Sequence, residues 1–241
     1  MIYIKLIKKI KELIKKILNY YGWKLTKNYI NKSYTNQKPN LELLERLHLA
    51  KGIFHLGGHR GTEAAIYDWL HKKTLWIEAN PKIFFELKDN ISKYVNQKAF
   101  NILLFQMDDE MIKFHISNND SASSSIYEFG SESKKQNLKM IESIYLKTKK
   151  IDTFFNENNI NSFEYDFWVI DLQGAELSVL KGAEESLKNC NYIYVEISKG
   201  DYYKNGTQWQ ELNSFMKKFN FYNLWEPENN HTDVLFEKKI N

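Results

Sequence analysis

Beyond residue 40, short apolar runs alternate with segments whose apolar residues recur at helical spacing. The apolar runs, which predict buried strands, lie at 53–57, 74–79, 102–106, 166–171 and 192–197. The helical segments lie at 61–71, 81–95, 174–188 and 207–219. Alternation of this kind predicts an α/β fold with a mostly parallel, doubly wound sheet and helices on both faces.

Two regions depart from this alternation. The runs 221–225 and 233–237 flank a turn-rich EPENNH and predict an antiparallel hairpin at one edge of the sheet. Residues 107–150 contain a strand-like MIKFHI, a polar NNDSASSS loop and a weakly helical stretch at 131–146. We expect this insertion to lie over the carboxyl ends of the strands, where loops often determine specificity.

Residues 1–21 carry a different pattern. Apolar residues recur at i, i+3, i+4 and i+7 between lysines, which predicts a basic amphipathic helix. Such a helix either adsorbs to an anionic membrane surface or packs on its own domain, and both readings stay open. Residues 22–40 lack periodicity and predict a linker before a domain at 41–241. Lysines interrupt the first apolar run and no small-residue cleavage site follows it, which argues against a signal peptide.

Charge is unevenly distributed along the 241 residues. Residues 1–40 hold ten Lys and one Glu, whereas residues 41–241 hold 24 Lys and Arg against 29 Asp and Glu. An acidic domain is a poor phosphate clamp, so we expect no nucleic-acid partner. One cysteine, Cys190, cannot form an internal disulfide, and no long uncharged apolar run predicts a membrane span. These features favour the cytoplasm, with peripheral association at the inner face of the membrane as the alternative.

The strongest chemical signal is the segment FHLGGHRGTEA. A predicted strand runs into Gly57, Gly58 and Gly61 and then into a helix, so backbone N–H groups can face a ligand. The spacing differs from the dinucleotide-binding fingerprint, which would place glycines at 57, 59 and 62, and no P-loop follows. A structural turn without a ligand is the alternative.

Glu78 favours the ligand-binding interpretation. It lies 21 residues after Gly57, at the carboxyl end of the second predicted strand, where a carboxylate can accept both hydroxyls of a ribose. The turn and the carboxylate together indicate a cofactor that carries a nucleoside. The alternative is that Glu78 caps the helix beginning near Pro81, although Asn80 is the better N-cap.

A second site signal is DFWVIDLQGAEL. Its apolar run ends at Asp171, and Gln173 turns the chain into a helix, so both side chains should face the same crevice as the first turn. A strand-end carboxylate is well placed to act as a general base, although a helix-capping role for Asp171 is the alternative. Glu196 ends the next apolar run and is a weaker catalytic candidate.

The sequence offers no dedicated metal site. His55 and His59 are four residues apart, but Gly57 and Gly58 between them disfavour a helix that would place both on one face. This leaves only transient Mg²⁺ binding open. No GxSxG motif is present, and Cys190 has no basic neighbour, so nucleophilic hydrolysis is unsupported.

Taken together, these segments resemble the FkbM-type methyltransferase family over roughly residues 51–238. The resemblance also rests on LWIEANPKIFFELKDNI, ISNNDSASSSI, LKTKKIDTF, DLQGAELSVLKGA and DVLFEKK, in this order and spacing. Many members have Asp where His55 stands and Glu where Gln173 stands. Both residues here resemble a branch whose first turn has the form HxGxH.

The resemblance implies a Rossmann-like class I methyltransferase fold, S-adenosylmethionine (SAM) as cofactor, and transfer of a methyl group to a hydroxyl of a sugar or similar small polar acceptor in glycan biosynthesis. The alternative is an inactive nucleotide- or glycan-binding protein, tethered to a membrane by its N-terminal helix. By resemblance, the glycines shape the methionine pocket, Glu78 holds the ribose, and the loop at 106–109 flanks adenine. The predicted cofactor-binding residues are His55, Gly57, Gly58, His59, Gly61, Glu63, Glu78, Ala79, Asn80, Gln106, Met107, Asp108 and Gln173; the predicted acceptor-binding residues are Asn118, Asn119, Ser123, Ser124 and Ser125; the predicted catalytic residues are Asp171 and Glu196.

Overall fold

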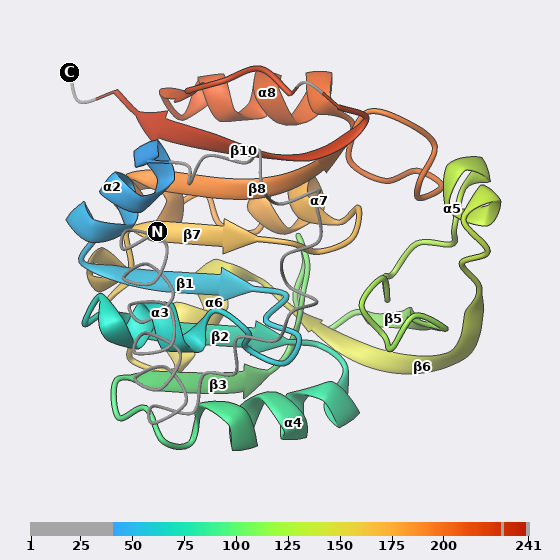
Figure 1. Ribbon diagram of the computed structural model, residues 1–241, viewed down its shortest axis with the longest axis horizontal. Coiled ribbons are helices and arrows are strands. Elements are labelled where there is room, and N and C mark those ends of the chain that lie inside the picture. Colours follow the sequence, from blue (N-terminus) through green and yellow to red (C-terminus); the bar gives the residue numbers. More distant parts are fainter. Residues whose placement is uncertain (1–40, 228, 240–241) are drawn as a thin grey trace, which may run out of the picture. The chain divides into compact units, whose positions relative to one another are not determined.

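The computed structural model describes residues 41–227 and 229–239, and it contains a central seven-stranded sheet (Figure 1). The strand order is β3-β2-β1-β7-β8-β10-β9. The five strands β3, β2, β1, β7 and β8 run parallel, whereas β10 is antiparallel to both of its neighbours. This order confirms the predicted α/β class I methyltransferase fold with an antiparallel edge. The strands are β1 (Gly52–Leu56), β2 (Lys73–Glu78), β3 (Gln97–Asn101), β7 (Phe167–Ile170), β8 (Tyr192–Ser198), β9 (Phe221–Asn223) and β10 (His231–Lys238).

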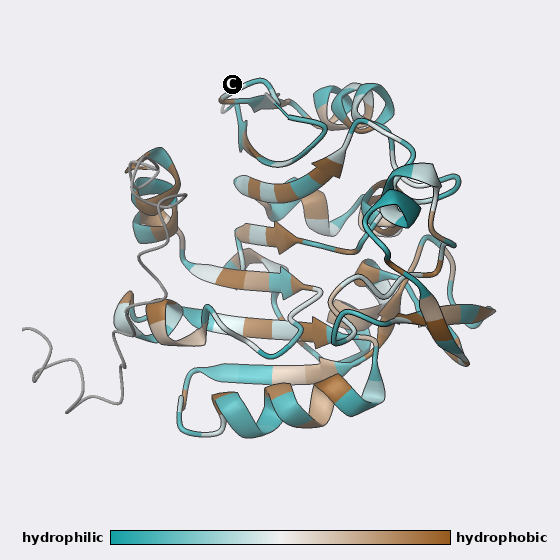
Figure 2. Cartoon of the chain, turned by 45° about the vertical axis from the view of Figure 1, so that its right-hand side comes forward, coloured by the Kyte–Doolittle hydropathy of each residue, from teal (hydrophilic) through white to brown (hydrophobic). Residues whose placement is uncertain are grey.

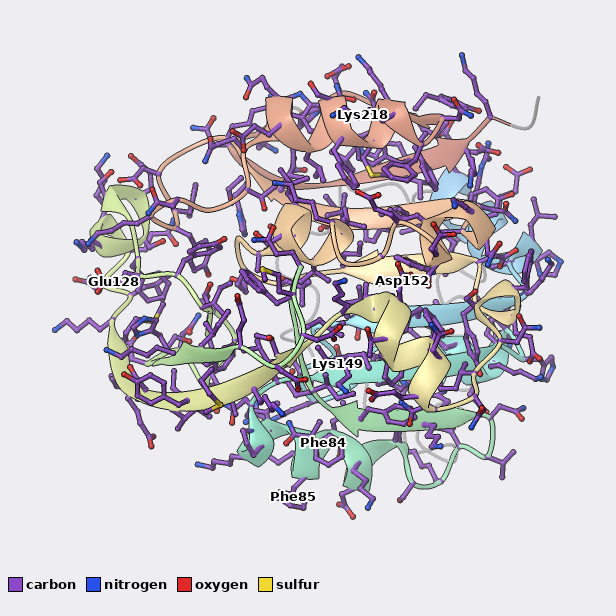
Figure 3. The ribbon with its side chains drawn as sticks, turned by 180° about the vertical axis from the view of Figure 1, so that it is seen from behind. Phe84, Phe85, Glu128, Lys149, Asp152 and Lys218 are labelled. Carbon is purple, nitrogen blue, oxygen red and sulfur yellow. The ribbon has the colours of Figure 1, made fainter. Side chains whose placement is uncertain are left out.

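Helices cover both faces of this sheet. In Figure 1 α3 lies in front of β1 and β2, and Figure 3 shows α6 on the opposite face, where Asp152 is labelled. Right-handed crossovers that leave the first strand in both directions produce this two-sided arrangement. The described helices are α2 (Leu41–Leu49), α3 (Ala64–Trp69), α4 (Pro81–Ile91), α5 (Ser131–Lys135), α6 (Ile151–Glu157), α7 (Glu176–Leu180) and α8 (Trp209–Lys218), with short 3-10 turns η2 (Ser162–Glu164) and η3 (Ser186–Asn189).

The core forms around the central strands. All five residues of β1 are buried, and Figure 2 shows hydrophobic residues concentrated along the central strands. Phe54 packs edge-on against Trp168 of β7 with ring centroids 5.5 Å apart, and it stacks on Phe154 of α6 at 5.8 Å. Burial on both faces explains why these parallel strands are continuous apolar runs in the sequence.

A second, three-stranded sheet lies beyond the carboxyl ends of the central strands (Figure 1). It consists of β4 (Leu103–Leu104), β5 (Met111–Ser117) and β6 (Met140–Lys149), with β6 in the middle. The predicted position of the insertion is therefore correct. The predicted helix over 131–146 is wrong after Lys135, because alternate residues of β6 pair with the apolar face of β5, as in the pairs Phe114–Ile144 and Ile112–Leu146.

The predicted strand at 102–106 is also wrong. The third parallel strand is β3, which is only partly buried because it lies at the sheet edge. The more apolar segment after it leaves this sheet, and Leu103–Leu104 pairs with β6. The strong hydrophobicity at 102–104 therefore reflects the position of these residues on a cavity wall and not burial in the central sheet.

The elements that form the site belong to the compact unit Glu45–Asn241. The predicted helix at 1–21 and the predicted linker at 22–40 lie outside the described residues. None of the helices in the described part of the chain is long and apolar enough to span a bilayer.

Candidate active site

A cavity opens at the carboxyl ends of β1, β2 and β7 and has an empty volume of about 650 Å³, counted to its open mouth. Polar groups gather at one part of its wall and aliphatic side chains at another. The cavity is lined by Gly57, His59, Ile77, Glu78, Ala79, Ile102, Leu103, Leu104, Phe114, Ser121, Ala122, Ser124, Ile126, Asp171, Leu172, Gln173, Ala175 and Val179.

Gly57 is the only glycine of the first turn that lines this cavity. Its φ of +82° is left-handed, and a Cβ at this position would lie 1.8 Å from the Asp171 carbonyl oxygen. Any side chain here would therefore push apart the turns that follow β1 and β7. Gly58 and Gly61 instead face packed side chains, since a Cβ would meet Trp76 at 2.8 Å and Leu87 at 2.7 Å, respectively. The absence of a side chain at Gly58 and Gly61 lets the turn pack closely against Trp76 and Leu87.

Glu78, the last residue of β2, is held in place by backbone groups. Its Oε2 accepts a hydrogen bond from the His59 N–H at 2.9 Å, and its Oε1 accepts one from the Asn80 N–H at 2.7 Å. Burial raises the pKa of this carboxyl to about 7, although these N–H groups oppose the shift. The carboxylate is fixed without any cationic partner, and its remaining lone pairs are available to hydroxyl donors in the cavity.

A serine-rich loop closes one side of the cavity. Ser121, Ala122 and Ser124 line the wall. The loop is fastened to the first turn, because the Arg60 guanidinium donates to both oxygens of Asp120 at 2.7 and 2.9 Å. The predicted loop therefore reaches the site, although not through every residue that the sequence indicated.

The five predicted acceptor-binding residues have different places in this loop. Ser124 lines the cavity, whereas Asn119 and Ser123 bond to each other and brace the loop. Ser125 is buried and donates to the Gln173 carbonyl at 2.7 Å, which ties the loop to the turn after β7. Asn118 bonds to the chain at 137–139, away from this cavity.

The apolar part of the wall includes Ile102, Leu103 and Leu104, which explains their hydrophobicity. The prediction that Gln106, Met107 and Asp108 border the cofactor is not supported, because none of the three lines the cavity. Asp108 instead accepts hydrogen bonds from Lys150 N and Thr153 Oγ1 at the start of α6. The third strand ends at Asn101, so the chain crosses the sheet edge several residues earlier than predicted.

Three other predicted residues lie off the cavity wall. His55 is buried, stacks on Trp76 at 4.4 Å, and its Nδ1 lies 3.1 Å from the Tyr67 hydroxyl. Burial lowers its pKa to about 4, so it is a neutral core residue off the cavity wall. Glu63 is exposed and accepts from Thr62 Oγ1. Asn80 caps α4 through a bond from Lys82 N, and only its neighbour Ala79 lines the cavity.

Asp171 and Gln173 line the cavity, as predicted, and join a polar network. The Gln173 amide nitrogen donates to Asp171 Oδ1 and, at 2.7 Å, to Glu196 Oε2. Its amide oxygen accepts from the Tyr203 hydroxyl, which fixes the orientation of the amide. His231 Nε2 lies 3.1 Å from Glu196 Oε1. Both predicted catalytic carboxyl groups therefore belong to one hydrogen-bonded system.

The pKa of Asp171 is raised well above its ordinary range. Desolvation is the largest cause, followed by the negative charge of Glu196 and a hydrogen bond between the two carboxyl groups; the bond from Gln173 acts in the opposite direction. Two close carboxyl groups tend to share one proton, because both cannot ionise easily. An aspartate in this state can take up a proton near neutral pH.

Sequence reasoning missed Tyr203, His231 and Glu176 as members of the site. Tyr203 comes from an irregular segment and His231 from the start of β10, so no local motif marks either residue. Glu176 is buried, and its Oε1 accepts from Leu172 N and Gly174 N. Its position three residues after Gln173 was a visible signal for a carboxylate that stabilises the turn.

Comparison with known proteins assigns the chain to a family. The model described as "Methyltransferase FkbM domain" matches residues 55–222, well over half of the chain. The chain belongs to the FkbM methyltransferase family. This confirms the family that the sequence resemblance predicted, and residues 55–222 form a methyltransferase domain of this family, whose implied cofactor is SAM.

Individual relatives are distant. The 2-O-methyltransferase NoeI of Sinorhizobium fredii (strain NBRC 101917 / NGR234) is 24% identical over 161 residues, which cover 63% of this chain and 65% of that protein, just under two thirds of its length. A SAM-dependent methyltransferase from Aquifex aeolicus has a TM-score of 0.46 and 10% identity, over 88% of this chain and 95% of that chain. Magnesium protoporphyrin IX methyltransferase from Synechocystis PCC 6803, solved with bound SAM, has a TM-score of 0.46 and 6% identity, over 95% and 97% of the two chains.

The cavity fits the FkbM cofactor in its chemistry. Glu78 would present a carboxyl group of fixed geometry to a ribose, and the aliphatic side chains of Ile77, Leu103 and Val179 would offer an apolar surface to adenine. The close approach at Gly57 keeps the floor between the two turns free of side chains. Within the described residues, no cluster of three or more His, Cys, Asp or Glu side chains could hold a metal ion.

Proposed function

We propose that this FkbM methyltransferase is an O-methyltransferase that acts on a hydroxyl of a sugar or a similar small polar acceptor. The position of Asp171 carries the proposal. It combines a place on the cavity wall, a raised pKa and a fixed amide neighbour. A hydroxyl must lose its proton during methylation, whereas a thioether or an unprotonated amine can react without a base.

The cofactor residues divide the cavity into two parts. Glu78 would hold the ribose, and Ala79 with the aliphatic wall of Ile102 and Leu104 would enclose the adenine. Gly57 and Gln173 would border the methionine part, on the side of Asp171. When bound, SAM supplies an electrophilic methyl group, and its sulfur leaves as the demethylated thioether.

Asp171 would act on the acceptor. Its carboxylate accepts the hydroxyl proton while the acceptor oxygen forms its bond to carbon, so the leaving proton stays on the protein. The Gln173 amide, held by the Tyr203 hydroxyl, keeps the Asp171 side chain in one orientation. Orientation of this kind contributes to rate because the reacting atoms are already in place.

The mouth of the cavity supports a polar acceptor. Ser121 and Ser124 lie on its wall, and small hydroxyl side chains can exchange hydrogen bonds with sugar hydroxyls. The relative from Sinorhizobium fredii carries the name 2-O-methyltransferase, which agrees with a hydroxyl acceptor. We infer a role in glycan biosynthesis from these two points. The alternative of an inactive binding protein is not favoured, because Asp171 and Glu78 both line the cavity.

The test is an acceptor panel with isotopically labelled SAM and detection of methylated products by mass spectrometry. The panel contains methyl glycosides of glucose, galactose, mannose, fucose and rhamnose, with a primary amine, a carboxylic acid and a thiol of similar size as comparisons. We expect methyl ether formation on at least one glycoside. Methylation of only the amine, acid or thiol would overturn the proposed acceptor class while leaving the FkbM assignment intact.

A further inference from the structure

The carboxyl pair that contains the proposed base continues to the protein surface. Asp171 lines the cavity, and the Gln173 amide nitrogen donates to its carboxyl group and to that of Glu196, which brings the two carboxyl groups together. Glu196 then lies 3.1 Å from His231 Nε2 through its other oxygen. The side chain of His231 is 39% exposed, compared with 20% for Glu196. His231 is therefore the more solvent-exposed of these two side chains.

A base on the wall of a filled cavity must release the proton that it has accepted before it can act again. Bound cofactor and acceptor would cover the cavity side of Asp171, so the proton needs another way to reach solvent before the next turnover. Gln173 cannot carry it, because an amide neither gains nor loses a proton usefully near neutral pH. Among the groups that the structure places against Asp171, Glu196 can both accept the proton and pass it outward.

We propose that Glu196 and His231 form the route by which the proton accepted by Asp171 leaves for solvent. The inference rests on the proposed role of Asp171 as base. The proton moves from the Asp171 carboxyl to the Glu196 carboxylate, then to the His231 imidazole, and finally to water. No oxidation or reduction takes place, and the route returns Asp171 to its carboxylate form.

The surroundings of His231 favour this task. Ser198 Oγ lies 3.0 Å from Nδ1, and the Tyr202 ring stacks on the imidazole with centroids 5.0 Å apart, so the ring is held with Nε2 toward Glu196. The hydrogen bond to Glu196 raises the pKa of His231 above its ordinary value, although burial opposes this shift. The titratable groups around the route are Asp171 after β7, Glu176 on α7, Tyr194 and Glu196 on β8, Tyr202 and Tyr203 in the segment after β8, and His231 and Asp233 on β10.

A second cavity offers a competing exit. Glu196 also borders a small polar cavity with Glu176, Tyr203 and Thr207, whose empty volume is about 260 Å³. Water in that cavity could accept the proton from Glu196 without any help from His231. The decisive experiment must therefore separate the imidazole from the cavity.

The first test needs no acceptor. Proton NMR of the full-length protein follows the titration of the His231 ring in the wild type, in Glu196→Gln and in Asp171→Asn. We expect the pKa of His231 to fall toward 6.5 in Glu196→Gln, and to rise in Asp171→Asn because the negative charge then stays on Glu196. An Asp171→Asn variant whose His231 titrates as in the wild type would overturn the proposal, since the ends of the route would be uncoupled.

The second test uses the methyl glycoside that is methylated fastest, in weak buffer with a pH indicator. Chemical quench reports methyl transfer and the indicator reports proton release in the same single turnover. His231→Gln keeps a hydrogen-bond donor for Glu196 but cannot carry a proton. We expect transfer within about three-fold of wild type, with proton release delayed at least ten-fold. In His231→Ala, added imidazole should remove the delay.

The outcomes are separable. Proton release that keeps pace with transfer in His231→Gln would overturn the route and assign the exit to the second cavity. A wild-type protein that methylates without releasing a proton would contradict Asp171 as base, which is a failure of the proposed function itself. If no glycoside is methylated, the acceptor class fails, and the NMR titrations still decide whether the three groups are coupled.

Discussion

Glu78 and Asp171 lie at the carboxyl ends of parallel strands in one sheet and line the same cavity, but different groups hold them. Backbone N–H groups of His59 and Asn80 fix both oxygens of Glu78. Asp171 instead depends on side chains, with Gln173 as donor and Glu196 as a carboxyl partner. One carboxylate is tied to the main chain and the other to groups that can rotate or titrate.

This difference indicates a division of work. Main-chain donors cannot be removed by rotation, so Glu78 stays an acceptor of fixed geometry, as a ligand-binding group requires. The pKa of Asp171 is raised by desolvation and by the negative charge of Glu196, so the protonation state of Asp171 can change during a reaction. The contrast therefore predicts that changes at Glu78 alter binding, whereas changes at Asp171 alter rate.

Asp171→Asn should have the largest effect. Asn can still accept from Gln173 through its amide oxygen, and its amide nitrogen can donate to Glu196, so the network keeps its shape. Without a base, the single-turnover rate of methyl transfer at saturating SAM and acceptor should fall about 10²–10⁴-fold. In the wild type this rate should rise with pH as Asp171 loses its proton, and the rise should be absent from the variant.

A rate within a few-fold of wild type would mean that Asp171 only positions the turn before α7. In that case Glu196 would be the next residue to test as the base. Loss of cofactor binding together with loss of rate would contradict the division of work, because it would give Asp171 the role assigned to Glu78.

Glu176→Gln tests the effect of main-chain fixation on stability. The hydrogen bonds from Leu172 N and Gly174 N to Glu176 both end on Oε1, which Gln retains. Burial raises the pKa of Glu176 from 4.5 to about 7, so the folded state binds this proton more tightly than the unfolded state. Wild-type stability should therefore fall as pH rises from about 4.5 to about 7, by about 3 kcal/mol for this group.

The measurement is urea unfolding of both proteins between pH 4.5 and 8. The variant should match the wild type near pH 4.5 and become more stable toward pH 8. Parallel pH profiles would show that Glu176 is not protonated in the folded protein near neutral pH.

Glu78→Ala should weaken SAM binding by about 1.5–3 kcal/mol, the range for lost charge-assisted hydrogen bonds. Glu63→Ala is the matched control, because Glu63 carries the same charge near the same turn but is exposed and lies off the cavity wall. Calorimetry should show unchanged affinity for the control. Equal losses in both variants would point to long-range charge and not to a contact with the ribose.

Deletion of residues 1–38 should have the smallest effect on the cavity, with SAM affinity within about two-fold of the full chain. The same deletion should abolish any salt-sensitive binding to anionic liposomes, because it removes nine net positive charges with the predicted apolar face. The control is a full-length variant in which Lys8, Lys9 and Lys11 are all replaced by Gln, because this variant keeps the predicted apolar face. Aggregation of the truncated protein would instead place the segment in the folded core.

The sequence patterns that predicted the fold correctly were those set by burial on both faces. The strands at 53–57 and 166–171 sit in the middle of the sheet, where apolar runs are continuous, whereas the neighbouring strand at 192–197 is buried at alternate residues. The third strand was misplaced because an edge strand needs fewer apolar residues than the cavity wall at 102–104. Strand β6 was missed because its partner β5 lies about 30 residues away in the sequence, as in the pair Ile112–Leu146.

Local structure also decided which residues near the cavity could be predicted from the sequence. Glu78, Asp171 and Gln173 were predictable because strand ends and tight turns position them locally. His55 lies off the cavity wall because a strand directs alternate side chains to opposite faces, and its ring stacks on Trp76. Tyr203 and His231 reach the site only through the order of β8 and β10 in the sheet, which no local motif records.

We propose that Glu78 binds the cofactor and that Asp171 acts on the acceptor. The most direct test is calorimetry of S-adenosylhomocysteine binding to Glu78→Gln and Asp171→Asn, two substitutions that each remove one carboxyl group with little change of shape. The account predicts at least a ten-fold loss of affinity in Glu78→Gln and a change within about three-fold in Asp171→Asn. The reverse pattern, or equal losses in both variants, would contradict it.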